Sequence, residues 1–371
     1  MLILLFGLGA CGGGGSGGGG NPGSGAGGAV GSQAFPAPHS QCSLSQAREE
    51  VLEIFEDLYF FNTDPAQVAR YSDIRANLSS YGSVDALLDD LRFGPDRTRG
   101  FSYFSTVEEV EQFFSAGEFF GFGFSVGIEP TSAWRLIDVF GGSPADLAGM
   151  SRGDTLLTVN GVATSGLDLN NPGTFGPPDA GVQRTIRFRK PDGSETEVTL
   201  TKTTVDLDPV PPSRVRVFEV GGRYVGYLFF RTFIEDADAL LRSAMAELQA
   251  QAIALGGIGI DDLIVDLRYN GGGLVATAEV IGSLMAGNAR AGQVFFTYEY
   301  NDLVTTQIGD PNNDVRRFRP EAQALEGLES VYYITDQASA SASELLISDL
   351  NKLNNDHILG IIAFRPTEFI N

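Results

Sequence analysis

The hydrophobic pattern of the chain changes character twice after its first forty residues. From residue 43, apolar side chains recur every three or four positions, as at Ile54, Phe55 and Leu58, with acidic residues between them. This is the period of an amphipathic helix. A second short helix is predicted to start near Ser83. We therefore expect residues 43–118 to form a small helical domain.

Residues 119–205 instead contain short runs rich in β-forming residues, separated by turns. The run 185–189 is expected to pair with 195–200 across the turn 191–194, which contains Pro, Asp and Gly. A serine, a proline and a terminal glycine mark a short helix over 143–149. This part of the chain is predicted to be a β-domain.

The last part of the chain, residues 206–371, alternates strand and helix patterns, which predicts an α/β core. Strands are expected at 225–230, 263–267, 294–300 and 331–335, with helices between them and after the last one. The expected fold class is multidomain α+β: a helical N-terminal domain, a β-domain and an α/β core.

The first residues indicate an export signal and a tether. Residues 1–11 are apolar or glycine and end in Leu-Gly-Ala-Cys, which resembles a bacterial lipobox with Cys11 as the lipidated residue. Residues 12–42 are rich in glycine, as in flexible linkers. We expect a protein anchored to a membrane through Cys11 in the bacterial cell envelope and facing the periplasm. The alternative is an apolar, unstructured start.

Composition narrows the chemistry. Among 371 residues, 47 acidic and 25 basic side chains give a net charge of −22, which disfavours nucleic acid as a partner. The chain has two cysteines, Cys11 and Cys42, and two histidines, of which His39 lies in the stretch before residue 43, and no structural zinc site of the Cys/His type is expected from them. No metal and no cofactor is expected. With Cys11 acylated, Cys42 is a single thiol and no disulfide is expected.

One candidate binding loop lies at the start of the β-domain. In the sequence Gly121, Phe122, Gly123 and Phe124, the glycines allow backbone N–H groups to converge on a carboxylate, and the phenyl rings can line an apolar pocket. Together with the strand-and-turn sequence at 153–161, this loop resembles a PDZ domain. The resemblance implies that a peptide C-terminus binds there as an added strand.

Two segments of the core are candidates for catalysis. In residues 266–273, three glycines follow a strand and precede a helix, so backbone N–H groups can face an anion or an oxyanion. Residues 339–344, Ser-Ala-Ser-Ala-Ser-Glu, also follow a strand and open a helix. Taken singly, the first would be a tight turn and the second a helix cap.

Together these segments resemble the C-terminal processing peptidases, or tail-specific proteases, over roughly residues 43–360. The resemblance implies a PDZ domain before a crotonase-like peptidase core that cleaves proteins near their C-terminal tails. It implies that Ser341 is the nucleophile and that the oxyanion hole consists of the N–H of Ala342 and one from Gly272 or Gly273.

The family's base is a lysine, and here the sequence departs from the pattern. The chain has three lysines: Lys190 and Lys202 in the β-domain, and Lys352, which lies about 16 Å along a helix from Ser341. Without gaps, the family's Gly-Lys pair falls on Arg365 and Pro366. Three explanations of the missing lysine remain open. The sequence has a frame shift or truncation near Gly360, the protein is a natural pseudoenzyme, or another base acts, with His357 as the candidate. We rank the frame shift or truncation first, and expect missing strands to leave an apolar sheet edge.

The sequence therefore predicts a serine endopeptidase of the C-terminal processing class whose catalytic lysine is missing from this chain. The alternative is an inactive lipoprotein that captures protein C-termini. An acyl-CoA enzyme of crotonase type is disfavoured, because such an enzyme needs neither a PDZ domain nor an envelope address.

Overall fold

The computed structural model describes residues 43–99, 102–104, 107–169, 171–298, 306, 315–336, 338–353 and 360–363. The chain divides into two compact units, one of residues 111–296 and 316–371 and one of residues 2–110 and 297–315. The predicted signal, tether and Cys11 lie outside the described residues. Among the helices that are described, none has the length and apolar character needed to cross a membrane.

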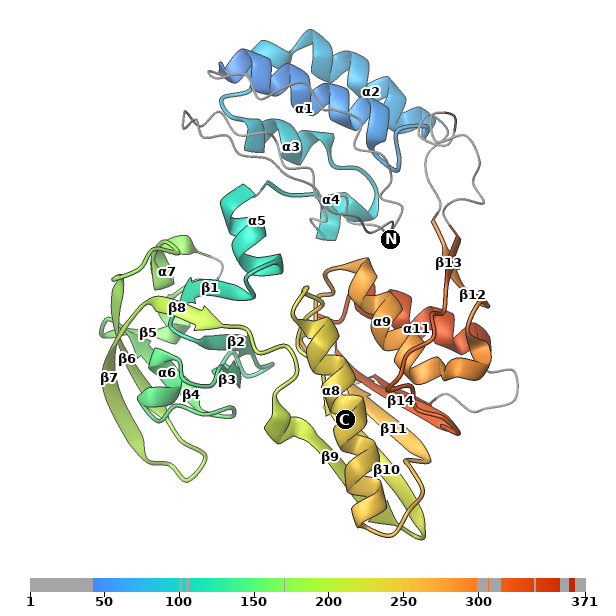
Figure 1. Ribbon diagram of the computed structural model, residues 1–371. Helices are drawn as coiled ribbons and strands as arrows, with labels where there is room; N and C mark the ends of the chain where they lie inside the picture. The colour runs from blue at the N-terminus through green and yellow to red at the C-terminus, as the bar shows by residue number, and fades with distance from the viewer. Residues whose placement is uncertain are drawn as a thin grey trace, which may run out of the picture. The chain divides into compact units, whose positions relative to one another are not determined.

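The second unit contains four described α-helices (Figure 1), of which the first three contribute buried side chains to one apolar cluster. They are α1 (Leu44–Leu58), α2 (Pro65–Ala76), α3 (Val84–Leu91) and α4 (Pro95–Arg99). Ser43 begins α1 with a capping box in which Gln46 is the partner. Helix α2 was not predicted from the sequence, because its buried side chains are few and include the polar Gln67.

In the first unit, α5 (Val107–Phe114) precedes two antiparallel sheets. Strands β1 (Glu118–Gly121) and β8 (Thr203–Asp206) pair as a two-stranded ribbon. A six-stranded sheet has the order β2-β3-β4-β6-β7, with β5 beside β4. Its elements are β2 (Phe124–Ile128), β3 (Trp134–Val139), α6 (Pro144–Leu147), β4 (Thr155–Val159), β5 (Val162–Ala163), α7 (Pro172–Phe175), β6 (Gln183–Arg189) and β7 (Glu195–Thr201).

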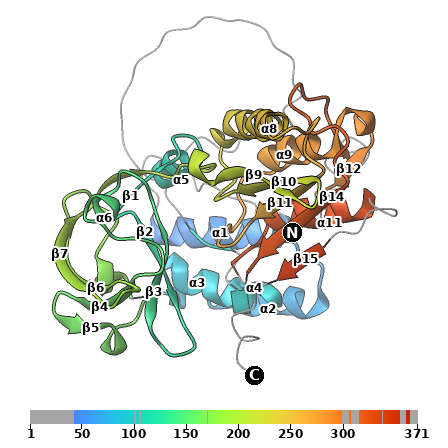
Figure 2. The ribbon, with the colours of Figure 1, turned by 90° about the horizontal axis from the view of Figure 1, so that it is seen from below.

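The rest of this unit is built on a five-stranded mixed sheet of order β15-β14-β11-β10-β9. Helices α8 and α9 lie along the same side of this sheet (Figure 2) and contact each other, and α11 contacts α9. The elements are β9 (Val215–Val220), β10 (Arg223–Phe229), α8 (Ala237–Ala254), β11 (Asp262–Asp266), α9 (Val275–Ala286), β14 (Ser330–Thr335), α11 (Ala342–Leu353) and β15 (Gly360–Ala363). Strands β12 (Val294–Thr297) and β13 (Val315–Arg317) pair separately.

Strands β10, β11, β14 and β15 run parallel, whereas β9 is antiparallel to β10. Parallel neighbours have their carboxyl ends at the same edge of the sheet, so the loops after β11 and β14 lie next to each other. Strand β15 pairs with β14 from Gly360 to Ala363 and is the last strand on this side of the described sheet, so the expectation of strands missing after Gly360 stays a prediction.

Candidate functional site

The two glycine- and serine-containing turns meet at the carboxyl ends of β11 and β14. The register pairs Asp266, the last residue of β11, with Ile334 of β14. The turn after β11 leads into α9, and the turn after β14 leads into α11. Residues about 70 positions apart in sequence therefore lie side by side because the strands before them are hydrogen-bonded neighbours.

Hydrogen bonds join the two turns, and the hydroxyls of two of the three serines in residues 339–343 take part in them. The hydroxyl of Ser339 donates to the carbonyl oxygen of Leu267 over 2.7 Å. The buried hydroxyl of Ser343 donates to the carbonyl oxygen of Asn270 over 3.0 Å. The N–H of Ala340 donates to the same oxygen over 3.2 Å. Ser339 and Ser343 thus hold the turns together.

Ser341 differs from both of these serines. Its φ is +56°, a left-handed conformation that non-glycine residues rarely adopt and that costs about 1–3 kcal/mol. Its N–H donates to Glu344 Oε2 over 2.9 Å, and among the described residues no hydrogen-bond partner of its hydroxyl is recorded. Ser341 is half-buried. Its hydroxyl therefore does not cap α11, which was the alternative interpretation of this segment.

Gly272 lies directly against Ser341. A methyl group added at its Cα would be 2.7 Å from the carbonyl oxygen of Ala340, 2.7 Å from Ser341 Cβ and 2.8 Å from the nitrogen of Ala342. Its φ of +99° also requires glycine. The close approach of the two turns at this point is possible only without a side chain.

The N–H groups near Ser341 are not equivalent. That of Gly272 donates to Asn270 Oδ1 over 2.9 Å. In the described part of the chain, no acceptor is recorded for the N–H of Gly273 or Ala342. Of the two glycines proposed for an oxyanion hole, the hydrogen bonding leaves Gly273 free and occupies Gly272. Free N–H groups at the start of a helix suit a developing negative charge.

An ion pair between the buried Asp266 and the half-buried Arg268 lies at the start of the first turn. Asp266 is fully buried and accepts hydrogen bonds from Arg268 Nε over 2.9 Å and from the Tyr227 hydroxyl over 2.8 Å. Burial by itself raises the pKa of Asp266, but these hydrogen bonds outweigh it and lower the pKa below its usual range. Burial and the charge of Asp266 raise the pKa of Tyr227 to about 12.

The structure places the lysines as follows. Lys190 Nζ donates to the carbonyl oxygen of Gly149 over 2.7 Å, in the six-stranded sheet region. Lys202 Nζ is held by two carbonyl oxygens in the same region. Lys352 belongs to the last turn of α11, which is continuous from Ala342, as the estimated separation from Ser341 assumed. His357 and Arg365 lie outside the described residues.

The candidate binding loop connects β1 to β2, with Gly121 ending one strand and Phe124 starting the other. Gly123 has φ +84°, and an added methyl group there would be 2.0 Å from Ser143 Cβ, so only glycine fits. Ser143 caps α6, and its hydroxyl lies 3.2 Å from the carbonyl oxygen of Gly123. Helix α6 therefore fixes the shape of this loop.

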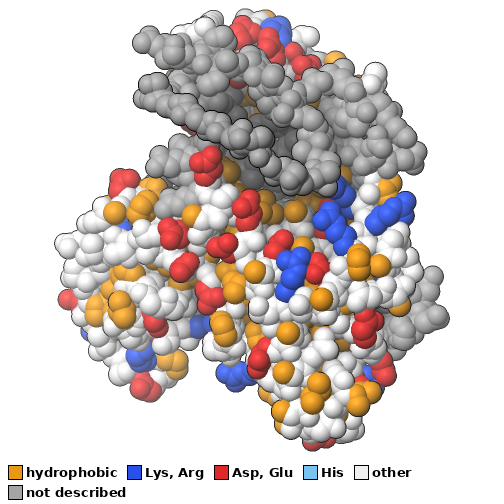
Figure 3. All heavy atoms as spheres, viewed as in Figure 1, with side chains coloured by type: hydrophobic (Ala, Val, Ile, Leu, Met, Phe, Trp, Pro, Cys, Tyr) orange, Lys and Arg blue, Asp and Glu red, His pale blue; other side chains and the backbone are white. Residues whose placement is uncertain are grey.

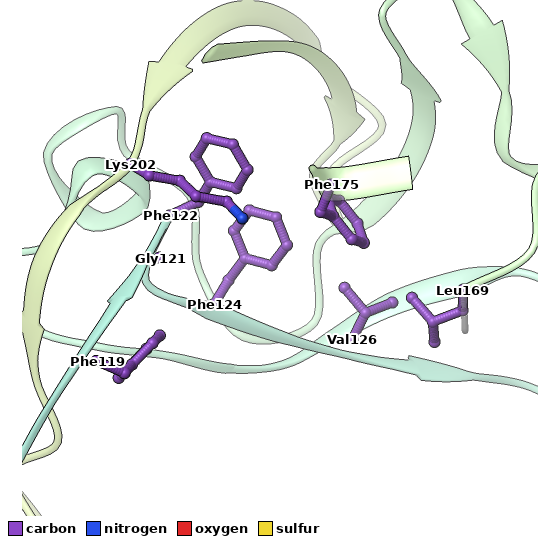
Figure 4. A pocket seen from close by; sticks show the side chains of 8 residues that line it. All are labelled: Phe119, Gly121, Phe122, Phe124, Val126, Leu169, Phe175 and Lys202. Carbon is purple, nitrogen blue, oxygen red and sulfur yellow. The ribbon is translucent and has the colours of Figure 1, made fainter. Parts of the chain in front are cut away.

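A pocket of about 270 Å³ opens beside the loop (Figure 4). Phe122 and Phe124 stack with ring centroids 6.1 Å apart, and Phe175 at the end of α7 meets Phe124 edge-on. Gly121 and Lys202 also line the pocket. It is mainly apolar and has one basic side chain.

Residues 224–364 match Peptidase family S41. This part of the chain is therefore similar to the S41 peptidases. The match ends at residue 364, four residues after Gly360. It contains both turns and Ser341.

Curated proteins that are similar to this chain include carboxy-terminal processing proteases. It is 25% identical over 268 residues to the protease CtpB of Bacillus subtilis, covering 71% of this chain and 50% of that protein. It is 26% identical to the carboxyl-terminal-processing protease of a Picosynechococcus strain, covering 67% and 55%. The chain thus spans about half the length of these relatives.

A crystal structure from Bacteroides fragilis assigned to the S41 proteases has a similar fold. The TM-score is 0.51 at 19% sequence identity, with 85% of this chain and 77% of that chain covered. At this identity the likeness concerns the fold. It supports the α+β architecture of mixed sheets and helices described above.

Proposed function

We propose that the protein is a serine endopeptidase with Ser341 as the nucleophile. The observation that carries the proposal is the different surroundings of the three serines: two hydroxyls hold the turns together, and that of Ser341 is left without a recorded partner in the described residues. Attack of this oxygen on a peptide carbonyl would place the oxyanion near the N–H groups of Gly273 and Ala342. The core is proposed to be crotonase-like.

In the resembling family the proton acceptor is a lysine, and we propose that this lysine is missing from the chain. Lys190 and Lys202 are engaged by carbonyl oxygens of the β-sheet region. The position of the family's Gly-Lys pair falls at Arg365 and Pro366, outside the described residues. In a chain that carries the family's lysine, the pKa of its amine would have to be lowered toward neutrality for the amine to accept the serine proton.

We further propose that residues 119–205 are a PDZ domain that recognises C-terminal tails. Strand β2 is an edge strand of its sheet, so a peptide can add beside it. The pocket lies next to β2, and the described residues contain no recorded acceptor for the N–H groups of Phe122 and Gly123. A tail bound here would direct its carboxylate to these N–H groups.

The test is cleavage of an unfolded protein that ends in an apolar tail, with the products identified by mass spectrometry. Ser341→Ala should abolish cleavage, a loss of at least about 1000-fold. Ser348→Ala is the matched control, because Ser348 is an exposed serine on the same helix, and it should retain activity. Cleavage that persists in Ser341→Ala would exclude the nucleophile.

An inactive protein that captures protein C-termini is the second candidate. The observation that favours it is that no lysine or histidine is recorded as a hydrogen-bond partner of Ser341 within the described ranges. Under this alternative, the wild-type chain binds the tailed protein without cleaving it, and Ser341→Ala changes neither result.

We also propose that the protein is a lipoprotein of the bacterial cell envelope, anchored through Cys11 and facing the periplasm. The sequence Leu-Gly-Ala-Cys and the glycine-rich stretch after it support this. Metabolic labelling with a fatty acid in a bacterial host should label the wild-type chain. Cys11→Ala should not be labelled, and Cys42→Ala is the control that should be.

A further inference from the structure

Lys202 is a buried cation in the wall of an apolar pocket. The residue is 7% exposed, and its Nζ lies 5.3 Å from the centroid of the Phe122 ring. Figure 4 shows the Nζ end of the side chain pointing toward the rings of Phe122 and Phe124. It is the charged side chain among the residues that line this pocket.

The ammonium group has incomplete partners. It donates to the carbonyl oxygens of Gly176 over 2.9 Å and Pro177 over 2.7 Å. A lysine ammonium has three donors, so one remains. No ion pair of Lys202 is recorded within the part of the chain that the structure describes. Lys190, by contrast, also donates to two groups, but one of them is the carboxylate of Asp154 at 3.3 Å.

A buried ammonium without a nearby anion is costly. Burial, and to a lesser degree the charge of Arg184, lower the pKa of Lys202, and Asp179 only partly opposes this. An anion that enters the pocket would remove part of this cost. The charge of Lys202 therefore favours the binding of a negative group in the empty pocket and disfavours a second cation.

The position of Lys202 relates it to the end of a bound chain. It is the residue between β7 and β8, and its neighbour Thr203 pairs with Gly121, the first residue of the binding loop. The carbonyl oxygens that hold its Nζ follow α7, the helix that ends in Phe175. Lys202 thus joins the loop to the far wall of the pocket.

We propose that Lys202 is a receptor for a carboxylate on the last residue of a bound peptide, and so sets the terminal specificity. This inference rests on the proposed binding of C-terminal tails at the same pocket. The carboxylate can be the chain terminus itself or the side chain of a terminal Asp or Glu. Its pairing with the third ammonium donor is a charge-assisted hydrogen bond.

The experiment measures binding of fluorescent peptides by anisotropy, using the full chain. One peptide pair ends in Val as the free acid or the amide, which tests the terminal carboxylate. A second pair ends in Glu-amide or Gln-amide, which tests the side chain. Lys202→Gln keeps hydrogen-bond donors for Gly176 and Pro177 but removes the charge. Lys202→Arg retains the charge, and Lys190→Gln is the matched control.

We expect the wild-type chain and Lys190→Gln to prefer the carboxylate member of at least one pair by about tenfold. Lys202→Gln should lose most of that preference, because only the N–H groups of Phe122 and Gly123 then remain for a carboxylate, and Lys202→Arg should largely keep it. If Lys202→Gln unfolds, as judged by circular dichroism, the ratio measured with Lys202→Met replaces it. An unchanged preference in the folded uncharged variant overturns the inference and leaves tail binding intact. No binding of any peptide by the wild-type chain overturns both.

Discussion

Ser341 and Ser343 are two positions apart, yet the backbone gives their hydroxyls opposite surroundings. Ser343 lies within α11, and its hydroxyl is used by the carbonyl oxygen of Asn270. Ser341 precedes the helix with a left-handed φ, which directs its side chain away from the helix-capping position. The strain at this residue is thus associated with an available hydroxyl, as at many catalytic positions.

Asp266 offers a test of how the turn beneath Ser341 is stabilised. Asp266→Asn should lower the free energy of unfolding at pH 7 by about 2 kcal/mol, because it leaves the half-buried Arg268 guanidinium without its carboxylate. The lowered pKa of Asp266 means that its contribution is present above the unfolded pKa of about 3.9 and is lost as pH falls through the folded value.

Urea unfolding of both proteins at pH 7, 5, 4 and 3 measures this difference. The gap should be constant between pH 7 and 5 and should shrink below about pH 4. Asp192→Asn, at an exposed carboxylate on the turn between β6 and β7, is the control and should leave the unfolding midpoint nearly unchanged. A gap that grows on acidification would contradict the assignment.

Part of the residue-level picture could be predicted from the sequence. The glycine turn and the serine segment were both identified, and the structure brings Gly272, Ser341 and Ala342 together. Which serine hydroxyls are hydrogen-bonded could not be predicted, because their acceptors are carbonyl oxygens of the turn after β11, far away in the sequence. Lys202 was missed as a pocket residue, although the two-residue period of β7 places it on the same face as the buried Leu200.

At the scale of elements, the turn between β11 and α9 is the most constrained. Gly272→Ala should lower the free energy of unfolding by about 3 kcal/mol, because its methyl group would overlap the backbone at Ala340 and Ala342 and its φ would be strained. Gly271→Ala is the neighbouring control: it is exposed, and its methyl group would be 4.0 Å from the nearest oxygen. It should change stability by less than about 0.5 kcal/mol. Equal effects in urea unfolding would refute this explanation.

The elements themselves were predicted unevenly. The strands β10, β11 and β14 and the β6–β7 hairpin lie within a few residues of their predicted bounds. Strong apolar runs or a clear turn marked each of them. Strand β9 was not predicted, because it is an edge strand whose residues Phe218 and Val220 are exposed and so carry no burial period.

At the scale of the molecule, acidic side chains are spread over the face shown in Figure 3, not gathered at one place. Within the first unit, Asp138 connects the six-stranded sheet to the region of the five-stranded sheet. This buried aspartate of β3 accepts hydrogen bonds from Arg231 over 2.7 Å and from Arg214 over 3.3 Å. The Arg231 guanidinium also lies 4.5 Å from the centroid of the Phe140 ring. The six-stranded sheet is thereby tied to residues that flank β9 and follow β10.

Asp138→Asn should therefore uncouple the unfolding of the two sheets of this unit and lower stability by about 3 kcal/mol. Trp134, the single tryptophan, is buried on β3 and reports on the six-stranded sheet. In urea, the tryptophan fluorescence and the far-ultraviolet circular dichroism of the wild-type chain should change together as the first unit unfolds. In the variant the fluorescence transition should occur at lower urea.

Glu129→Gln, directly after β2, is the matched control. Glu129 pairs with Arg135, but both side chains are more than a third exposed, so the loss should be below about 1 kcal/mol. If the fluorescence and dichroism transitions of Asp138→Asn remain superimposed, the two sheets are coupled by other contacts.

The ribbon of β1 and β8 has a consequence for how this architecture can be rearranged. Glu118 and Asp206, where the chain enters and leaves the β-sheet region, are paired directly with each other. The segment between them therefore begins and ends at the same place in the fold. Such a segment can be exchanged as a cassette, with one recognition module replaced by another of different length, while the chain on either side keeps the same path.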